Sequence, residues 1–163
     1  MHEDSYNLMR AFAEKYCDGT ENVLDVGSLD VNGTYRDIFP NYTGMDVVEG
    51  DNVDLVLDYQ DGYIGKYNTD KKYDVVICGN VIEHVANPFG FVHALANLVS
   101  ESGYLCIITP TDIHLHDHPK DYWRIMPDGM ELLMKNAGMT VEAMDMIDGL
   151  HNDLICVAEH GCI

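Results

Sequence analysis

The stretch VLDVGSLDVNGTYRDIFPNYTGMD, residues 23–46, decides the fold of this chain. Its first apolar run is followed at once by Gly27, and Gly33 lies six residues further on. This order predicts a buried strand and then a turn that approaches a ligand closely, because glycine has no Cβ to obstruct it. A second strand over 42–47 carries Asp46, nineteen residues after Gly27, where a carboxylate can accept hydrogen bonds from both hydroxyls of a ribose. The stretch therefore indicates a site for a cofactor that contains a nucleoside.

Length and composition bound the kind of protein. The chain has 163 residues, 47% of them hydrophobic, which suits one domain with one core. We expect a single domain over 1–163, with an N-terminal helix in 1–20 and the core in 21–163. No apolar run is long enough to span a bilayer, so we expect a cytoplasmic protein with no membrane partner. The five cysteines lie far apart without a CxxC pair, which favours free thiols in a reducing compartment.

The charge balance is strongly acidic. The chain carries 28 acidic residues against 9 basic ones, a net charge of −19. Such a surface repels phosphate backbones, and no stripe of lysine and arginine offsets the repulsion. We therefore expect no nucleic-acid partner.

Hydrophobic periodicity predicts the remaining elements. Helices are expected over 5–16, over 34–39, from an Asn87 cap and Pro88 onward, and over 128–136, with a loop or poor helix over 59–72. Further strands are expected over 53–57, 73–78, 103–110, 139–146 and 153–159. Alternating strands and helices imply a parallel sheet covered on both faces, whereas the last two strands are joined by too few residues for a crossover. The prediction is a doubly wound α/β fold with seven strands, mostly parallel, and an antiparallel last strand.

Four motifs carry a resemblance to a known family. They are LDVGSLDVNG at 24–33, Asp46, YDVVICGNVIEHVANP at 73–88 and GYLCIITP at 103–110. Over nearly its whole length the chain resembles the class I S-adenosylmethionine-dependent methyltransferases, and the segment 118–139 is similar to that of small methyltransferases found near saccharide-biosynthesis genes. The resemblance implies a Rossmann-like fold, S-adenosyl-L-methionine as cofactor, and methyl transfer to a small-molecule substrate, with a saccharide hydroxyl as our preferred acceptor.

The resemblance also implies which residues bind the cofactor, at the ends of the first four strands. Residues after the first strand would shape the pocket for the methionine part, and those after the second would hold the ribose and the adenine. The acid after the third strand would reach the adenine amine, and the residue after the fourth would face both cofactor and substrate. These residues are, in that order, Asp25, Gly27, Ser28 and Leu29; Asp46 and Val47; Asp58; and Asn80.

Leu29 departs from the commoner loop of this family, which has glycine at that position. The same departure weighs more heavily against an NAD-dependent oxidoreductase, whose GxGxxG loop needs that glycine so that the backbone can approach the pyrophosphate. Two alternatives stay open: a non-catalytic module that binds S-adenosylmethionine or a nucleotide, and, less favoured, the oxidoreductase.

Methyl transfer from a sulfonium needs a positioned nucleophile and, for a hydroxyl, a group that removes its proton. His84 follows the fourth strand at the edge where ligands bind in such sheets, so we predict it as the catalytic base. The alternative is that Glu83 and His84 brace the next element.

The segment HLHDHPKDYWR, residues 114–124, follows the fifth strand and is expected to lie over the substrate. We predict substrate contacts for His118, Tyr122, Trp123 and Arg124, with the aromatic rings offering flat surfaces and the arginine binding an anionic group. The alternative is that Trp123 packs under a helix and Arg124 pairs with an acid.

Alternate histidines at 114, 116 and 118 could share one face and bind a metal, but nothing else in the sequence calls for one, so we predict no metal. Because so short a core lacks a substrate cap, a homodimer is a further option.

Overall fold

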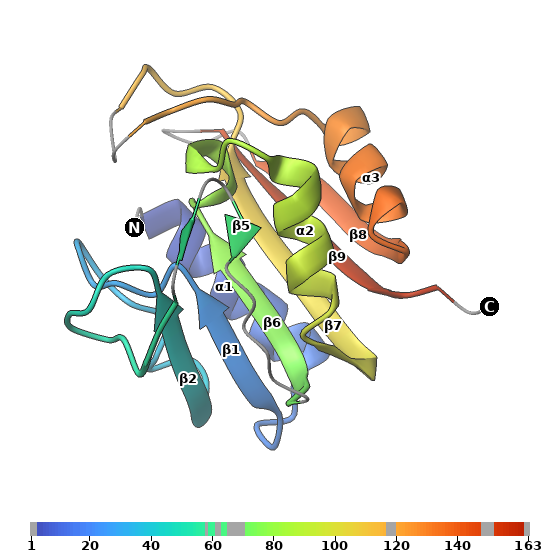
Figure 1. Cartoon of the computed structure of the whole chain (residues 1–163). Coiled ribbons are helices and arrows are strands. Elements are labelled where there is room, and N and C mark those ends of the chain that lie inside the picture. Colours follow the sequence, from blue (N-terminus) through green and yellow to red (C-terminus); the bar gives the residue numbers. More distant parts are fainter. Residues whose placement is uncertain are drawn as a thin grey trace.

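Figure 1 shows the computed structural model of the chain, which describes residues 3–57, 59–60, 63–64, 71–116, 120–147 and 152–161. One sheet of seven strands has the order β3-β2-β1-β6-β7-β9-β8, and β4 and β5 form a separate pair. The strands are β1 (Asn22–Val26), β2 (Asn41–Asp46), β3 (Leu55–Val56), β4 (Tyr59–Gln60), β5 (Tyr63–Ile64), β6 (Tyr73–Gly79), β7 (Val99–Pro110), β8 (Met139–Ile147) and β9 (Asp153–His160). The helices are α1 (Glu3–Tyr16), the short 3-10 helix η1 (Ile82–His84), α2 (Pro88–Ala96) and α3 (Pro127–Asn136).

The strand directions confirm the predicted fold class. Pairs β1–β2, β1–β6, β2–β3 and β6–β7 are parallel, whereas β9 runs antiparallel to both β7 and β8. The predicted hairpin of the last two strands is therefore present, although its turn lies outside the described residues. The register aligns Asp25 with Gly44 and Ile77, so the carboxyl ends of β1, β2 and β6 lie side by side.

Two apolar layers enclose the sheet, one on each face. Along β6, Val76 and Cys78 join the core beneath α2 and α3, while Val75 and Ile77 join the core beneath α1. In Figure 1 α2 and α3 lie in front of the sheet and α1 lies behind it. The alternation of side chains along a strand explains why this apolar run is buried on both sides.

The start of α2 follows the predicted capping pattern. The Asn87 side chain accepts a hydrogen bond from the Gly90 backbone N–H at 3.1 Å, and Pro88 occupies the first helical position. Proline is favoured there because its missing N–H would have no partner inside the helix. The cap fixes where the chain leaves the site region and enters the helix.

Four predicted elements differ from the structure. Residues 34–39 form a turn and not a helix, because six residues before Pro40 are too few to sustain one, and Tyr35 and Phe39 pack instead on the sheet face beneath α1. The strand predicted over 53–57 is reduced to Leu55–Val56, and β7 begins at Val99, before the predicted Gly103. Within 59–72, β4 and β5 pair as an antiparallel ribbon where a loop or poor helix was expected.

Among the helices that the structure describes, none is both long and apolar enough to cross a membrane.

Candidate active site

The turn after β1 brings the backbone to the carboxyl edge of the sheet. Gly27 has φ +88°, and its N–H and that of Ser28 donate to the Met45 carbonyl at 2.8 and 3.1 Å. A Cβ at Gly27 would lie 2.2 Å from Val81 Cγ2, so the position is closed to larger residues. The predicted glycine turn therefore joins the ends of β1, β2 and β6, where ligands bind in open α/β sheets.

Asp46 is the acid at the end of β2, as predicted. Its carboxylate accepts three backbone N–H groups: Leu29 at 3.1 Å on Oδ2, and Val47 and Val48 at 2.7 and 3.1 Å on Oδ1. Two carboxylate oxygens offer about four acceptor directions, so capacity remains for a ligand hydroxyl. Val47 beside it is exposed, as a residue that lies against a flat ring would be.

Asn52 braces this loop from the neighbouring connection. Its amide donates to the Ser28 carbonyl at 2.7 Å and to the Tyr42 hydroxyl at 2.9 Å, and its Oδ1 accepts from Arg36 Nε at 2.6 Å. Arg36 also pairs with Asp54 at 2.6 Å. The sequence reasoning missed this brace. In the structure Asn52 has φ +70°, a left-handed conformation that asparagine adopts more readily than most residues.

Asp25 lies inside the protein beneath the turn. It is 3% exposed and accepts a 2.5 Å hydrogen bond from the Tyr42 hydroxyl. Burial raises the pKa of its carboxyl to about 7, against the opposing effect of the Tyr42 hydrogen bond, and the negative charge of Asp46 raises it further. Its contact with a cofactor stays a prediction.

This raised pKa predicts a pH dependence of stability. Between about pH 4, where the unfolded carboxyl titrates, and about pH 7, the folded state keeps a proton that the unfolded state loses. The stabilisation is therefore complete below about pH 4 and is lost as the pH rises to about 7. Urea unfolding across this range is expected to show a smaller fall for Asp25→Asn than for the wild type. Equal slopes would exclude the buried proton.

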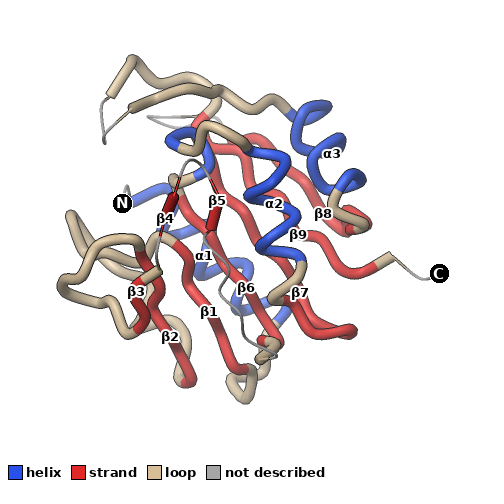
Figure 2. Tube along the Cα trace, in the orientation of Figure 1, coloured by secondary structure: helices blue, strands red, loops and turns tan. Residues whose placement is uncertain are grey.

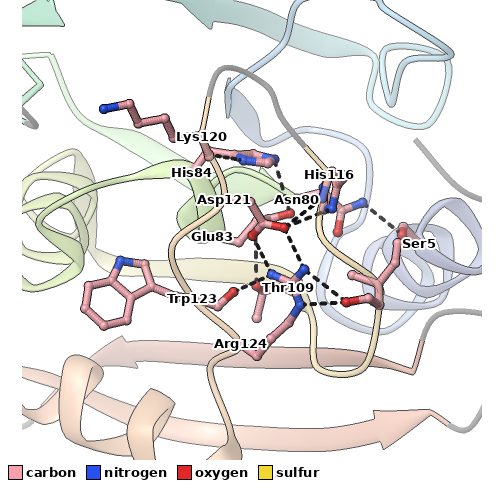
Figure 3. A network of polar contacts seen from close by, with 11 residues as sticks. Ser5, Asn80, Glu83, His84, Thr109, His116, Lys120, Asp121, Trp123 and Arg124 are labelled. Atoms are coloured by element: carbon pink, nitrogen blue, oxygen red, sulfur yellow. Dashed lines mark hydrogen bonds and ion pairs between the residues drawn. The ribbon is translucent and has the colours of Figure 1, made fainter.

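A second group of polar residues lies across the edge, and Figure 3 shows Ser5, Asn80, Glu83 and Thr109 among its members. Asn80 follows β6 with φ +57°, and its amide donates to Ser5 Oγ of α1 at 3.1 Å. Ser5 in turn donates to Asp153 Oδ2 at the start of β9 at 2.6 Å. Thr109 Oγ1 of β7 lies 3.5 Å from Glu83 Oε2 of η1. In the described part of the chain, Asn80 Oδ1, Glu83 Oε1 and Asp153 Oδ1 are buried acceptors without a hydrogen-bond partner.

Glu83 holds the segment after β7 over this group. Its backbone carbonyl accepts from the N–H of Tyr122 at 2.8 Å and of Trp123 at 3.3 Å, and the Trp123 indole donates to the Val85 carbonyl at 2.8 Å. The Glu83 side chain is fully buried, and burial raises the pKa of its carboxyl to about 8. Figure 2 shows the described parts of the connection between β7 and α3, residues 111–116 and 120–126, at the carboxyl edge of the sheet.

Arg124 is used inside that loop. All five of its N–H directions have acceptors, because it forks onto Asp121 at 2.5 and 2.6 Å and also bonds the carbonyls of Ile113 and Trp123. The Arg124 hydrogen bonds hold the pKa of Asp121 well below its usual range. Of the two roles that the sequence left open for Arg124, this geometry favours pairing with an acid.

His84 lies between the loop and the buried acid. Its Nδ1 is 2.7 Å from the Lys120 carbonyl, and its Nε2 is 3.8 Å from Glu83 Oε1. Because a carbonyl accepts and cannot donate, Nδ1 carries the proton and the neutral ring has its lone pair on Nε2. Nε2 is therefore the atom of His84 that can accept a proton.

The remaining predicted residues lie differently. Tyr122 and Trp123 are 45% and 41% exposed, and Asp58 and His118 lie outside the described residues.

Sequence reasoning missed Ser5 and Asp153. The reversal of β9 was the available signal for Asp153, since an antiparallel strand begins at the edge where its parallel neighbours end. No local pattern marks Ser5, which reaches the site by the packing of α1.

Comparison with known protein families identifies a methyltransferase domain. A family model described as a methyltransferase domain matches residues 5–143. No curated protein sequence is a significant match to the chain.

Solved structures with this fold are numerous. An S-adenosylmethionine-dependent methyltransferase from Clostridium acetobutylicum superposes with a TM-score of 0.68 at 10% identity, covering 99% of this chain and 93% of its own. A 1,6-didemethyltoxoflavin-N1-methyltransferase from Burkholderia thailandensis, with S-adenosylhomocysteine bound, gives 0.76 at 13%, covering 97% and 79%. The magnesium protoporphyrin IX methyltransferase from Synechocystis PCC 6803, with its cofactor bound, gives 0.67 at 16%, covering 98% and 80%.

The predicted family and fold class are confirmed. The model match spans most of the chain, and the sheet has the mixed order with one reversed strand. This chain therefore belongs to the methyltransferase-domain family, and it has the fold of the S-adenosylmethionine-dependent methyltransferases of known structure.

Proposed function

We propose that this protein transfers the methyl group of S-adenosylmethionine to a hydroxyl of a small molecule, with a saccharide as the preferred acceptor. One observation carries the proposal: the glycine turn and Asp46 lie at the carboxyl ends of β1 and β2, and His84 follows the neighbouring strand β6. A donor and an acceptor can thus meet between a binding end and a proton-accepting end.

The residues at the binding end fit the cofactor. Asp46 keeps acceptor capacity for the ribose hydroxyls, and Leu29 and Val47 flank it. Asn80 Oδ1 is a buried acceptor without a partner among the described residues, which matches an ammonium donor such as that of the methionine part. S-Adenosylmethionine carries a net positive charge, so a chain of net charge −19 attracts it.

The chemistry asks little of the protein beyond placement. The acceptor oxygen attacks the methyl carbon, an O–C bond forms, and the C–S bond breaks with its electron pair going to sulfur. The hydroxyl proton must leave, and we propose that His84 Nε2 accepts it, because the Lys120 carbonyl fixes the ring with its lone pair on that atom. The leaving group is neutral S-adenosylhomocysteine.

The acceptor is proposed from the loop that lies along the edge. Tyr122 and Trp123 are both about half-exposed there, and flat aromatic surfaces suit a sugar ring. Two of the solved structures above are methyltransferases of 1,6-didemethyltoxoflavin and of magnesium protoporphyrin IX, small molecules of unlike shape, so they support the small-molecule class and not a particular acceptor. Contact of His118 with the acceptor is part of the proposal.

The domain organisation, cellular location and oligomeric state of the protein are part of the proposal. We propose one domain over 1–163 that works in the cytoplasm, since the four described cysteines are free thiols, as in a reducing compartment. A homodimer would supply a cover for the acceptor. Sedimentation of fully active protein as a monomer would exclude it.

Transfer of a labelled methyl group tests the function. S-Adenosylmethionine with a radioactive methyl would be incubated with a panel of free hexoses and nucleotide sugars, and label in the sugar fraction measured. His84→Gln is expected to slow transfer by a factor of about 100 to 10,000, the usual contribution of a general base. His93→Gln, on the exposed side of α2, is the matched control and is expected to act as wild type. Cofactor binding without transfer to any sugar would contradict the saccharide proposal, and transfer unchanged in His84→Gln would remove the base.

A further inference from the structure

Three potential metal ligands from two separate segments meet at the substrate end of the site. Glu83 and His84 belong to η1, and His116 belongs to the loop after β7. One carboxylate oxygen and one ring nitrogen from each histidine lie within 4.8 Å of one another. Figure 3 shows the three side chains converging, with Asp121 beside them. The two segments are 32 residues apart in sequence at their nearest members, His84 and His116.

His84 is oriented as metal-binding histidines usually are. Its Nδ1 donates to the Lys120 carbonyl at 2.7 Å, which directs the lone pair of Nε2 toward Glu83 Oε1, 3.8 Å away. Histidines that bind metals commonly donate the other ring N–H to a carbonyl or carboxylate in this way. The carbonyl thus fixes both the tautomer and the ring plane.

The other two ligands leave buried atoms unsatisfied. Within the described residues, Glu83 Oε1 and His116 Nδ1 are both buried without a hydrogen-bond partner. The Glu83 side chain is fully buried, and His116 Nδ1 lies 3.3 Å from Asp121 Oδ2. A buried acceptor without a hydrogen-bond donor is costly unless a proton or a cation satisfies it.

We infer that Glu83, His84 and His116 bind one divalent transition-metal ion of the Zn²⁺ type. Two imidazoles and one carboxylate are a donor set of catalytic zinc sites, which keep a further position open for water or substrate. Ligand atoms around a tetrahedral zinc ion lie about 3.4 Å apart, so closing the present 4.8 Å limit needs side-chain movement of about an ångström. Mg²⁺ and Ca²⁺ prefer sites built from oxygen, so the two imidazoles favour zinc over them.

This site differs from the alternate histidines that the sequence suggested. His114 is exposed and is not a member of the cluster, and His118 lies outside the described residues. The ligands come instead from η1 and from one histidine of the loop. The predicted absence of a metal is therefore replaced by a proposal for one.

The role of the ion rests on the proposed function. An ion at this position can bind the acceptor hydroxyl in its open position and lower the pKa of that hydroxyl, so that the oxygen attacks as an alkoxide. In the metal-bound protein His84 Nε2 is a ligand and the proton passes to solvent, whereas in the metal-free protein Nε2 accepts the proton as proposed above. Methyl transfer by the metal-bound protein is therefore expected to fall when a chelator removes the metal.

Zinc titration of the purified full-length chain tests the site. After removal of metals, the wild type is expected to bind one Zn²⁺ per chain by calorimetry, without added cofactor. Glu83→Gln and His116→Ala are each expected to weaken binding by more than about 100-fold, beyond the loss that follows from changing an outer hydrogen-bond partner. His114→Ala is the matched control from the same loop and is expected to bind as the wild type.

A second measurement guards against misfolding of the variants. Stoichiometric Zn²⁺ is expected to raise the thermal midpoint of the wild type and of His114→Ala but not of His116→Ala, because a ligand that binds the folded state stabilises it. Absence of stoichiometric binding by the wild type, or equal affinity in all four proteins, would overturn the site. So would an equal loss in His114→Ala. Binding of S-adenosylhomocysteine, measured separately, shows whether the proposed function fails while the metal site stands.

Discussion

Replacing Asp46 with alanine is expected to lower the affinity for S-adenosylhomocysteine by at least about 100-fold. The two ribose hydroxyls would lose a charged acceptor, and each such hydrogen bond contributes about 1.5–3 kcal/mol. The same change leaves the N–H groups of Leu29, Val47 and Val48 without their present acceptor, which loosens the loop that we propose to shape the cofactor pocket. Calorimetric titration measures the dissociation constant directly.

Glu49→Ala is the matched control for that variant. It removes one exposed negative charge three residues along the same loop. Its affinity is expected to stay within a few-fold of the wild type, because an exposed charge at that distance is screened by salt. Equal losses in both variants would mean that charge alone binds the cofactor, and no loss in Asp46→Ala would remove the ribose assignment.

Replacing Gly27 with alanine is expected to destabilise the fold and to disrupt the cofactor site together. The left-handed φ of +88° costs an alanine about 1–2 kcal/mol, and the new Cβ would meet Val81 Cγ2 at 2.2 Å. Overpacking of that kind adds about 1–3 kcal/mol. We expect the free energy of unfolding in urea to fall by about 2–5 kcal/mol, with a parallel loss of S-adenosylhomocysteine binding.

Gly138→Ala separates the two causes. Gly138 follows α3 with φ +77°, yet nothing lies within 4 Å of the position that its Cβ would take. It is expected to lose the conformational part alone, about 1–2 kcal/mol, and to keep normal cofactor affinity. Equal destabilisation of the two variants would show that the Val81 contact is unimportant.

Much of the fold follows from local patterns. The run YDVVIC is buried on both faces because successive side chains of a strand point to opposite sides, and α1 and α2 cover those sides. Asn87 and Pro88 mark the start of α2 by the chemistry of unpaired N–H groups. The short link between β8 and β9 forces the reversal that completes the sheet.

The errors in the fold come from segments where context outweighs propensity. Residues 34–39 are compatible with a helix in composition. In the turn that they form instead, Tyr35 and Phe39 are buried against the sheet face beneath α1, and so short a helix would be only marginally stable. The extra residues at the start of β7 pair through a shifted register between Tyr73 and Val75, which no local signal marks.

The two ends of the site also differ in how far local sequence patterns could predict them. The proximity of Gly27, Leu29 and Asp46, where we propose that the cofactor binds, was predictable because they belong to one short motif whose spacing encodes its geometry. The substrate end was not, because Ser5, Glu83, His116 and Asp153 come from distant elements. The sequence left the role of Arg124 open between an anionic substrate group and an acid, and the structure pairs it with Asp121 three residues away.

Calorimetric titration of the wild-type chain with S-adenosylhomocysteine and, separately, with NAD⁺ tests the central claim most directly. The turn after β1 lacks the second glycine that a pyrophosphate needs, whereas Asp46 and Asn80 offer acceptors to a ribose and an ammonium group. We predict saturable one-to-one binding of S-adenosylhomocysteine and none of NAD⁺. Binding of NAD⁺ in its place, or of neither by folded protein, would contradict the assignment of this edge to S-adenosylmethionine.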